Sequence, residues 1–515
     1  MLARCSTAAL LGLEARSVTV EVDLAPGLPG LQMVGLADAA VQEARERVRS
    51  ALRHGGFKVP LTRVVVNLAP ADLRKEGPGF DLPVALAMLV ASGQLAPAEI
   101  TGVWSCGELG LDGQLRPVRG CLAIALAARE QGARALLVPA ANGAEASLVD
   151  GLQVWPAARL GEAVTLLRQP PPPGSPPHRP SQPAAPASED LADVRGQQHG
   201  RRALEIAAAG GHHLLLCGPP GSGKTMLARR LAGLLPPLSP AEALELTGIH
   251  SVAGLLGEGG GLVSSRPFRA PHHSCTGAAL IGGGAIPRPG ELALAHRGIL
   301  FLDELAEFRR EVLDRLRQPL EEGELWIHRA RHRSRFPCRI TLVAATNPCP
   351  CGWHGDPERS CSCNANQRQH YWGRLSGPLL DRIDLQVVLQ RPDSQALSAP
   401  FRPAVPEAAT ATPTENTATV RQRVEAARER MQRRNPAGCS NAELSGAALQ
   451  RGLRIEEPAL ELWEAALRVR HLSARSGERL LRVALTLADL AGTERIGGGQ
   501  IAEALTYRSL DGRSR

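Results

Sequence analysis

Hydrophobic positions in the first 168 residues repeat with two different periods, so strands and helices alternate in this part of the chain. Strand-like alternation marks residues 18–22, 64–67 and 136–138. Apolar residues at three- and four-residue spacing predict helices at 39–53, 82–92 and 120–131. Mixed elements of this kind predict an α+β or α/β domain over residues 1–168.

Two segments of biased composition interrupt the rest of the chain. Residues 169–189 are rich in proline, which stiffens a chain and prevents a packed core, so we expect a linker. Residues 394–419 are rich in alanine, proline and threonine and lack periodicity, so we expect a loop or disordered insert. Helical periodicity returns over residues 420–515, most clearly at 420–433, 458–470 and 477–490, and predicts a small helical lid.

A glycine-rich segment lies between an apolar run at 213–217 and a helical pattern at 226–235. This strand–loop–helix context is typical of a phosphate-binding loop. Its residues are Gly218, Pro219, Pro220, Gly221, Ser222, Gly223, Lys224 and Thr225. The glycines allow backbone N–H groups to surround phosphate oxygens at the positive end of a helix. Lys224 would reach the β- and γ-phosphates and the Thr225 hydroxyl would hold Mg²⁺, which predicts an ATP site.

Two further apolar runs end in polar residues suited to ATP hydrolysis. The run at 298–302 ends at Asp303, which is placed to order the Mg²⁺ shell, and at Glu304, which suits the general base. The run at 339–346 ends at Asn347, which would orient the attacking water. The alternatives are a solvated acidic pair and a turn-forming Asn before Pro348. Parallel strands ending at one edge would make residues 190–393 an ATPase core of α/β class.

Composition and charge limit the setting in which such a protein works. The 515 residues carry a net charge of +8, which permits an anionic partner without naming one. No apolar run approaches the roughly 20 residues of a membrane span, so we expect no membrane partner.

The first 13 residues faintly resemble a signal peptide, but charged residues and the strand pattern at 18–22 follow, so we expect a folded amino terminus. Eleven cysteines, an odd number with four bunched together, favour a reducing cytoplasm.

Arginines after the Asn347 run are candidates for action between subunits of a ring. Arg382 is our first choice for an arginine that enters a neighbour's site and neutralises charge on the γ-phosphate, and Arg374 is the second. The alternative for Arg382 is a salt bridge to Asp within one subunit. In the lid, Arg475, Arg479 and Arg482 start a predicted helix; Arg475 is favoured as the residue that contacts phosphate, and solvated positions are the alternative.

A second group of arginines suggests what such a motor would act on. Arg329, Arg331, Arg333 and Arg335 are spaced by two residues. On one extended strand this spacing places all four on one face. Guanidinium groups in a row suit a phosphate backbone and require no reading of base sequence, so we predict DNA contacts. A solvated charged face is the alternative.

Four of the cysteines form two close pairs. Cys349 and Cys351 are followed ten residues later by Cys361 and Cys363. Four thiolates can complete a tetrahedral Zn²⁺ site, with His354 or His370 as substitute ligands. The alternative is four reduced thiols in a loop, because the spacing within each pair is tighter than usual.

Taken together, these motifs resemble the magnesium-chelatase-like AAA+ proteins called YifB or ComM. The resemblance rests on residues 34–41, 67–81, 218–225, 268–274, 298–308, 345–352 and 376–384. It implies an AAA+ P-loop core with a carboxyl-terminal helical lid, preceded by an α+β domain of Lon-protease/ribosomal-S5 type. It also implies a homohexamer on ATP and on single-stranded or branched DNA. The implied function is DNA branch migration, a helicase-type activity, in recombination during natural transformation.

Two departures and two rival functions accompany this resemblance. Gly79 stands where Lon-type proteases carry a nucleophilic Ser, and without that oxygen a Ser–Lys dyad cannot form, so we reject proteolysis. Residues 484–489 depart from the family pattern and make the choice of lid arginine less direct. A chelatase-type motor that remodels a protein partner for metal insertion into a porphyrin is the other rival.

Overall fold

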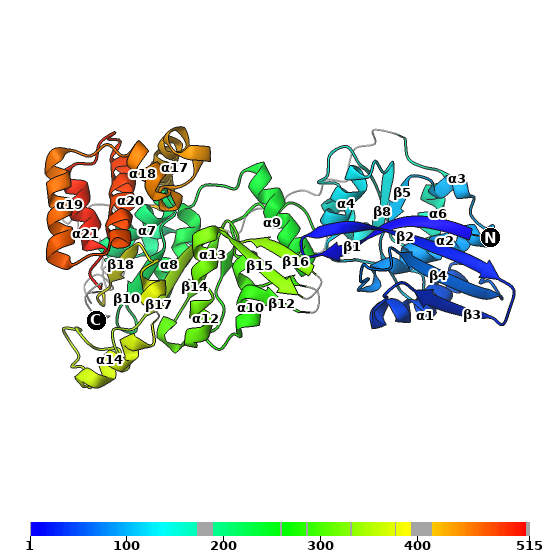
Figure 1. The fold of residues 1–515 in the computed structure, drawn as a ribbon, viewed down its shortest axis with the longest axis horizontal. Helices are drawn as coiled ribbons and strands as arrows, with labels where there is room; N and C mark the ends of the chain where they lie inside the picture. Colours follow the sequence, from blue (N-terminus) through cyan, green and yellow to red (C-terminus); the bar gives the residue numbers. More distant parts are fainter. Residues whose placement is uncertain are drawn as a thin grey trace, which may run out of the picture.

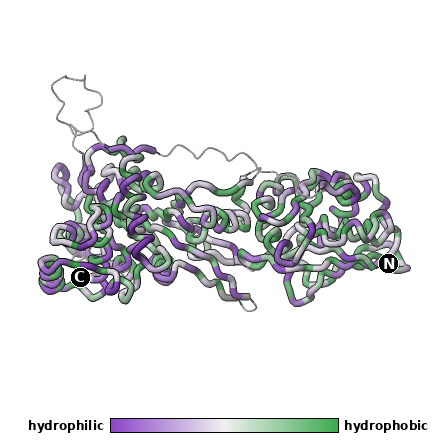
Figure 2. The backbone as a smooth tube through the Cα atoms, turned by 90° about the horizontal axis from the view of Figure 1, so that it is seen from above, coloured by the Kyte–Doolittle hydropathy of each residue, from purple (hydrophilic) through white to green (hydrophobic). Residues whose placement is uncertain are grey.

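Three parts lie in a row along the molecule in the computed structural model of the chain (Figure 1). The structure describes residues 2–172, 189–257, 260–284, 287–329, 332–375, 377–392 and 415–510. Most of the predicted linker, most of the predicted insert, and Arg331 lie outside the described residues. Figure 2 shows the row from above, with hydrophobic stretches of backbone in every part.

The amino-terminal part is built on a mixed seven-stranded sheet with the order β3-β4-β2-β1-β5-β8-β9. Its strands are β1 (Leu2–Leu11), β2 (Glu14–Ala25), β3 (Gly30–Val34), β4 (Arg63–Ala69), β5 (Val103–Ser105), β8 (Ala135–Pro139) and β9 (Gln153–Ala157), with the small pair β6 (Glu108–Leu109) and β7 (Leu115–Arg116) beside it. Its helices are α1 (Ala39–His54), α2 (Asp81–Ala91), α3 (Pro97–Ile100), α4 (Cys121–Glu130), α5 (Gly143–Ala146) and α6 (Leu160–Arg168). After Asp81, helix α2 is apolar on all sides, and every one of its residues is buried, as expected for a core helix.

The central part contains a parallel five-stranded sheet with the order β11-β14-β17-β10-β18. Its strands are β10 (Leu214–Cys217), β11 (Phe268–Arg269), β14 (Ile299–Leu302), β17 (Thr341–Thr346) and β18 (Leu385–Val388). Both faces are covered, because Leu214 and Leu216 pack into one core and Leu215 and Cys217 into another. Continuous apolar runs are the sequence pattern of such strands, and the α/β class predicted for this part is confirmed.

Helices and two small hairpins surround this sheet. The helices are α7 (Gln198–Gly210), α8 (Lys224–Leu234), α9 (Pro240–Ala253), α10 (Gly277–Ile281), α11 (Glu291–Leu294), α12 (Arg310–Asp314), α13 (Arg317–Glu322), α14 (Ala365–Gly373) and α15 (Gly377–Leu380). The hairpins are β12 (Gly282–Gly283) with β13 (Arg288–Pro289) and β15 (Glu324–Arg329) with β16 (His332–Pro337). Helix α9 begins at a capping box in which Ser239 and Glu242 satisfy each other's backbone N–H groups.

The first and central parts contact each other at two places. Gly120 N donates to Ser251 O over 3.1 Å, and the Ser251 hydroxyl donates to the buried carboxylate of Glu145. The turn between β1 and β2 reaches β16, where Gly12 lies so close to Ser334 that a Cβ on the glycine would be 2.9 Å from the serine Cβ (Figure 1). The first domain therefore rests on α9 and on one side of the β15–β16 hairpin.

The last part is helical. Its helices are α17 (Thr417–Arg434), α18 (Gly446–Gly452), α19 (Glu457–Arg470), α20 (Ala474–Ala491) and α21 (Gly498–Thr506). Helix α17 begins at Thr417, three residues before the predicted helical segment, because the Asn416 side chain caps it. Within the described residues, no helix is long and apolar enough to cross a membrane.

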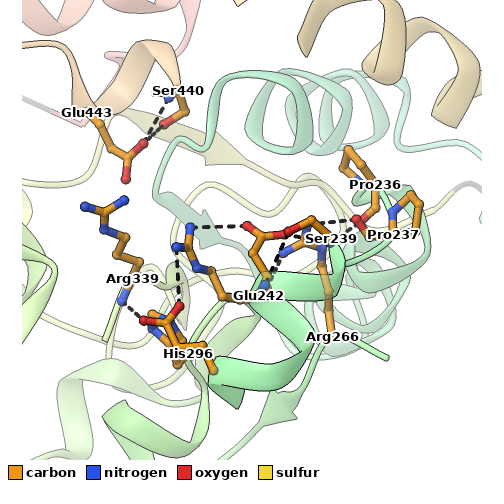
Figure 3. A network of polar contacts seen from close by, with 11 residues as sticks. Pro236, Pro237, Ser239, Glu242, Arg266, His296, Arg339, Ser440 and Glu443 are labelled. Atoms are coloured by element: carbon orange, nitrogen blue, oxygen red, sulfur yellow. Dashed lines mark hydrogen bonds and ion pairs between the residues drawn. The ribbon is translucent and has the colours of Figure 1, made fainter. Parts of the chain in front are cut away.

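A polar network joins the strands at their amino-terminal edge (Figure 3). His296 precedes β14; its Nε2 lies 2.9 Å from Glu245 Oε2, and its Nδ1 accepts from Arg339 N over 3.0 Å. The hydrogen bond with His296 is the main cause that lowers the pKa of Glu245 to about 2. Glu443 of the helical part faces Arg339 across this network (Figure 3). This edge is thus occupied by structural polar contacts.

The helical part is joined to the same edge through a buried histidine. His212 precedes β10; its Nδ1 donates to Asp384 over 2.9 Å and its Nε2 lies 2.8 Å from Thr486 Oγ1 in α20. Burial alone would raise the pKa of Asp384, but His212 and Arg479 lower it to about 2. The carboxylate is therefore charged, buried and dependent on its partners.

We expect His212→Ala to loosen this joint. The change leaves the buried Asp384 carboxylate with Arg479 as its charged partner, 3.7 Å away, and should lower the free energy of unfolding by about 3 kcal/mol. Urea denaturation followed by circular dichroism measures the loss. His54→Ala, at an exposed position on α1, is the control and should leave the midpoint unchanged. Equal midpoints for the two variants would contradict the role of His212.

Candidate active site

The glycine-rich loop follows the buried strand β10 and ends where α8 begins. Gly221 and Gly223 have φ angles of +79° and +84°, a region that favours glycine. At Gly218 a Cβ would lie 2.7 Å from Ser222 Oγ and 2.8 Å from Leu389 O, so a side chain has no room there. The loop thus presents its backbone and the first N–H groups of α8, which is the arrangement that binds phosphate.

Lys224 and Asn347 meet beside this loop. The Lys224 ammonium donates to Gly218 O over 2.7 Å, to Pro219 O over 3.0 Å and to Asn347 Oδ1 over 3.2 Å. The contact forms because β10 and β17 are parallel neighbours, with Cys217 paired to Thr346. Burial lowers the pKa of Lys224, and the charge of Asp303 opposes this effect. The predicted phosphate-binding and water-orienting residues therefore share one site.

Thr225 and Asp303 form the second pair at this edge. The Thr225 hydroxyl donates to Asp303 Oδ2 over 3.0 Å, while Asp303 Oδ1 accepts from the backbone N–H of Glu304 over 2.9 Å. A hydroxyl and a carboxylate that converge beside a phosphate-binding loop are the oxygen ligands that Mg²⁺ prefers. The donor set of Thr225 and Asp303 fits Mg²⁺.

Glu304 is turned away from its strand. Its φ angle of +51° is uncommon for a residue with a side chain and directs the carboxylate out of the line of β14. Glu304 Oε2 lies 3.2 Å from His273 Nδ1, and both side chains are partly exposed. His273 was not among the functional residues predicted from the sequence. It lies in the 268–274 segment that carries the family resemblance, and two adjacent histidines after a short strand were the available signal.

Arg382 and Arg374 are already paired within the chain. Arg382 Nη2 lies 2.6 Å from Glu321 of α13, and Nη1 donates to Pro378 O over 2.7 Å. An intrachain salt bridge therefore exists, but the partner of Arg382 is Glu321 of α13 and not an Asp. Arg374 lies 3.3 Å from Glu307, which follows the Asp303–Glu304 pair. Arg382 precedes β18, at the edge opposite the glycine-rich loop.

Arg475 lies in the first turn of α20 and is exposed. Ser473 and Ser476 beside it line one pocket with Pro378 and Asp381, so the segments of Arg475 and Arg382 are neighbours. Both segments lie towards the amino-terminal ends of the strands. Neither arginine is therefore brought to the glycine-rich loop of its own chain.

The other two arginines predicted for the lid, Arg479 and Arg482, have partners within the helical part or at the place where it meets β18. Arg479 lies 3.7 Å from Asp384. Arg482 lies 3.8 Å from Glu478 and donates to Ala442 O over 3.3 Å.

The predicted row of arginines on one strand is wrong. Arg329 ends β15, Arg333 and Arg335 belong to β16, and the chain reverses between the strands; Arg331 lies outside the described residues. Register pairs Arg329 with His332. Arg333 and Arg335 are both exposed: Arg333 stacks over the Trp326 ring at 4.1 Å, and Arg335 pairs with Glu324 at 2.6 Å. The opposite side of the hairpin is apolar and buried, because Leu325, Ile327 and Phe336 join the core.

The four clustered cysteines come together beside the glycine-rich loop. Their sulfur atoms all lie within 4.8 Å of one another, with separations of 3.3 Å for Cys349–Cys351, 3.7 Å for Cys349–Cys361 and 3.6 Å for Cys351–Cys361. A Zn–S bond of about 2.3 Å places the sulfurs of a tetrahedral site about 3.8 Å apart. The cysteines fit such a site by themselves, and neither His354 nor His370 belongs to the group found among the described residues.

The cysteine segment also touches the nucleotide loop. Gly352, with a φ angle of +84°, packs so closely on Pro220 that a Cβ would lie 2.8 Å from the proline Cδ. Trp372 of α14 donates to Pro348 O over 3.1 Å. The segment between Asn347 and α14 is therefore held against the loop that would bind phosphate.

Comparisons with known proteins agree with this architecture. The family described as magnesium chelatase, subunit ChlI, matches residues 190–397; two related descriptions, subunit ChlI of Mg-chelatase and the ChlI carboxyl-terminal domain, match 20–142 and 414–508. An uncharacterized protein of Mycobacterium tuberculosis (strain H37Rv) is 46% identical, over 99% of each chain. The uncharacterized protein YifB of Escherichia coli (strain K12) is 44% identical, and competence protein ComM of Haemophilus influenzae (strain Rd) 43%, each over 98% of this chain and 96% of its own.

Near-complete coverage at this identity, together with the arrangement of Lys224, Asp303 and Asn347, settles the family. The chain belongs to the YifB/ComM family of magnesium-chelatase-like AAA+ ATPases.

Proposed function

We propose that this protein is an ATP-driven DNA motor of helicase or branch-migration type that works as a ring homohexamer. The observation that carries the proposal is the order of elements after α13. The hairpin with exposed Arg333 and Arg335 is followed within four residues by β17, and Asn347 of the candidate nucleotide site comes directly after β17. The exposed arginines, which suit a phosphate backbone, are thus connected through β17 to Asn347, the residue that would orient the attacking water. The name of the relative competence protein ComM supports a role in competence, which we propose to be recombination during natural transformation.

Each residue of the candidate site has a separate role in the proposed hydrolysis of ATP. Lys224 would hold the β- and γ-phosphates, and Thr225 and Asp303 would hold Mg²⁺, which when bound would neutralise charge at the phosphates. Glu304 accepts the proton of the attacking water, and the Asn347 amide orients that water. Placement of these groups at one strand edge makes in-line attack on the γ-phosphate the reaction that the site favours.

A ring completes this site from the opposite edge of a neighbouring subunit. Arg382 and Arg475 lie on adjacent segments towards the strand edge opposite the loop of their own chain, so one neighbouring subunit can supply both. The Arg382–Glu321 pair at 2.6 Å would be exchanged for a contact with the γ-phosphate. In this arrangement charge developing in the transition state is stabilised only in the assembled ring.

A chelatase-type motor is the second candidate, because all three matched family descriptions name a magnesium chelatase subunit. Such a motor would remodel a protein partner for metal insertion and would not require the arginine hairpin. Proteolysis is not proposed, because Gly79 offers no hydroxyl in the short turn at Pro78–Phe80.

We also propose that Cys349, Cys351, Cys361 and Cys363 bind one Zn²⁺. The sulfur separations match a tetrahedral site, and all four ligands come from one short segment. The ion would hold this segment in its position against Pro220 and so stabilise the wall of the nucleotide site.

Glu304→Gln tests the general base. The amide keeps the shape of the side chain but cannot accept a proton, so ATP turnover should fall at least about 10²-fold while ATP binding remains. Steady-state ATPase assays and binding of a fluorescent ATP analogue give the two quantities. Glu311→Gln, an exposed acid on α12, is the matched control and should keep normal turnover. Normal turnover in Glu304→Gln would remove Glu304 as the base.

The double variant Arg333→Ala/Arg335→Ala tests the DNA contact and separates the two candidate functions. Loss of two phosphate contacts should reduce the slope of log Kd against log salt by about two for duplex DNA and abolish DNA-stimulated ATP hydrolysis. Arg45→Ala/Arg53→Ala removes the same charge from exposed positions of α1 and should change neither quantity. DNA binding and stimulation that survive in the hairpin variant would contradict the proposed surface, and stimulation only by a protein partner would favour the chelatase-type motor.

Elemental analysis tests the metal site. Protein purified from zinc-supplemented cells should contain about one zinc per chain, and Cys361→Ser/Cys363→Ser should contain almost none, because two ligands cannot hold a structural Zn²⁺. Cys439→Ser, outside the cluster, is the control and should keep the metal. Wild-type protein without stoichiometric zinc would refute the site.

A further inference from the structure

The hairpin formed by β1 and β2 extends beyond the rest of its sheet. β5 pairs with β1 at Ser6, and the pairing of β4 with β2 begins at Thr19. The two strands of the hairpin remain paired with each other as far as Leu11 and Glu14. The end of the hairpin therefore projects from the first part of the molecule towards β16 (Figure 1).

The projecting turn is packed against the central part of the molecule. It consists of Gly12 and Leu13, which lie between the last paired residues of the two strands. Gly12 is buried, although the turn of a hairpin is usually exposed to solvent. Leu13 packs against the core that contains Phe336 of β16. The turn is therefore part of the contact between the first and central parts.

The neighbouring residues fix the base of this turn. Leu10 lies so close to Gly120 that a Cβ on the glycine would be 2.6 Å from Leu10 Cδ1. Gly120 N in turn donates to the backbone oxygen of Ser251 in α9, and the Ser251 hydroxyl donates to Glu145. The first part is thus held on α9 while its projecting turn contacts β16.

Strand β16 directs its side chains to two faces. Arg333 and Arg335 are exposed, whereas Ser334 and Phe336 are buried. The turn lies on the buried face, because a Cβ on Gly12 would be 2.9 Å from Ser334 Cβ and 3.8 Å from Phe336 Cζ. The Ser334 hydroxyl has no hydrogen-bond partner among the described residues, so close packing makes this contact. The turn and the two arginines therefore occupy opposite faces of one strand.

We propose that the turn of Gly12 and Leu13 holds β16 in the orientation that presents Arg333 and Arg335 to a DNA backbone, and that Gly12 is a positioning residue for DNA binding. A two-stranded hairpin has little stability of its own, so packing on its buried face limits the orientations of its exposed face. Arginines that are already oriented lose less conformational freedom when they bind. This inference rests on the proposed DNA contact of the hairpin and gives the first part of the chain a role in that contact.

Gly12→Ala tests the inference in the full-length protein. The added Cβ does not fit against Ser334, so it should separate the turn from β16 and raise the Kd for duplex DNA about fivefold. The slope of log Kd against log salt should stay unchanged, because both arginines remain and neutralise the same phosphates in the complex. Fluorescence anisotropy of labelled duplex DNA over a range of salt concentrations gives both quantities. DNA-stimulated ATP hydrolysis, relative to the rate of the same variant without DNA, should require correspondingly more DNA.

Two further variants separate loss of the contact from strain in the turn. Gly132→Ala places an alanine at a φ angle of +70°, close to the +65° of Gly12, in the same part of the chain. Apart from its chain neighbours, no described heavy atom lies within 4 Å of the new Cβ, so the Kd should remain that of the wild type. Gly12→Ala/Ser334→Gly removes the Cβ that the alanine would meet and should return the Kd towards the wild-type value.

The outcomes separate this inference from the proposed function. A higher Kd in Gly12→Ala, with the wild-type salt slope and with recovery in the double variant, supports the positioning role. An unchanged Kd in Gly12→Ala, a slope reduced by about two as expected for loss of both arginines, an equal loss in Gly132→Ala, or a double variant without recovery overturns the positioning role; the DNA motor stands if the wild type binds DNA. A wild-type protein that neither binds DNA nor hydrolyses ATP faster in its presence overturns the proposed function and the positioning role with it.

Discussion

Parallel pairing of β10, β14 and β17 is the constraint on which the nucleotide site depends. Pairing of Cys217 with Thr346 and of Leu302 with Ala344 brings three strand ends to one edge. Two hydrogen bonds then cross between segments far apart in the sequence, from Lys224 to Asn347 and from Thr225 to Asp303. The apolar strands that make this pairing stable are buried on both faces, so the chemistry is confined to their ends.

The opposite edge of the same sheet has a different role. There the hydrogen bonds of His212 with Asp384 and Thr486 join the helical part to the central sheet. Beside them, His296 before β14 is paired with Glu245 of α9 (Figure 3). The segments of Arg382 and Arg475 lie beside this joint, away from the glycine-rich loop of the same chain. One chain therefore carries the two halves of the proposed inter-subunit site on opposite edges, which suits head-to-tail contacts around a ring.

Local patterns predicted the residues whose role depends on their immediate neighbours. An apolar run followed by a glycine-rich loop or an acid is recognisable wherever it occurs, so Lys224, Thr225 and Asp303 were found without the fold. The arginine row failed because the reversal after Arg329 has no Asn-Gly or similar turn signal, and a spacing of two also fits an unbroken strand. His273 was missed because it follows β11 whereas Glu304 follows β14, and no local pattern links the two segments.

The sequence by itself determined that a nucleotide loop, two acids, an asparagine and four neighbouring cysteines are present, since periodicity and short spacing express these features directly. Only the tertiary structure decided which of them meet. It paired Arg382 with Glu321, turned Glu304 towards His273, placed Arg333 and Arg335 on one strand of a hairpin and set the cysteine segment against Pro220. The physical reason is that strand order and register, which set these meetings, arise from burial of whole faces and not from any one segment.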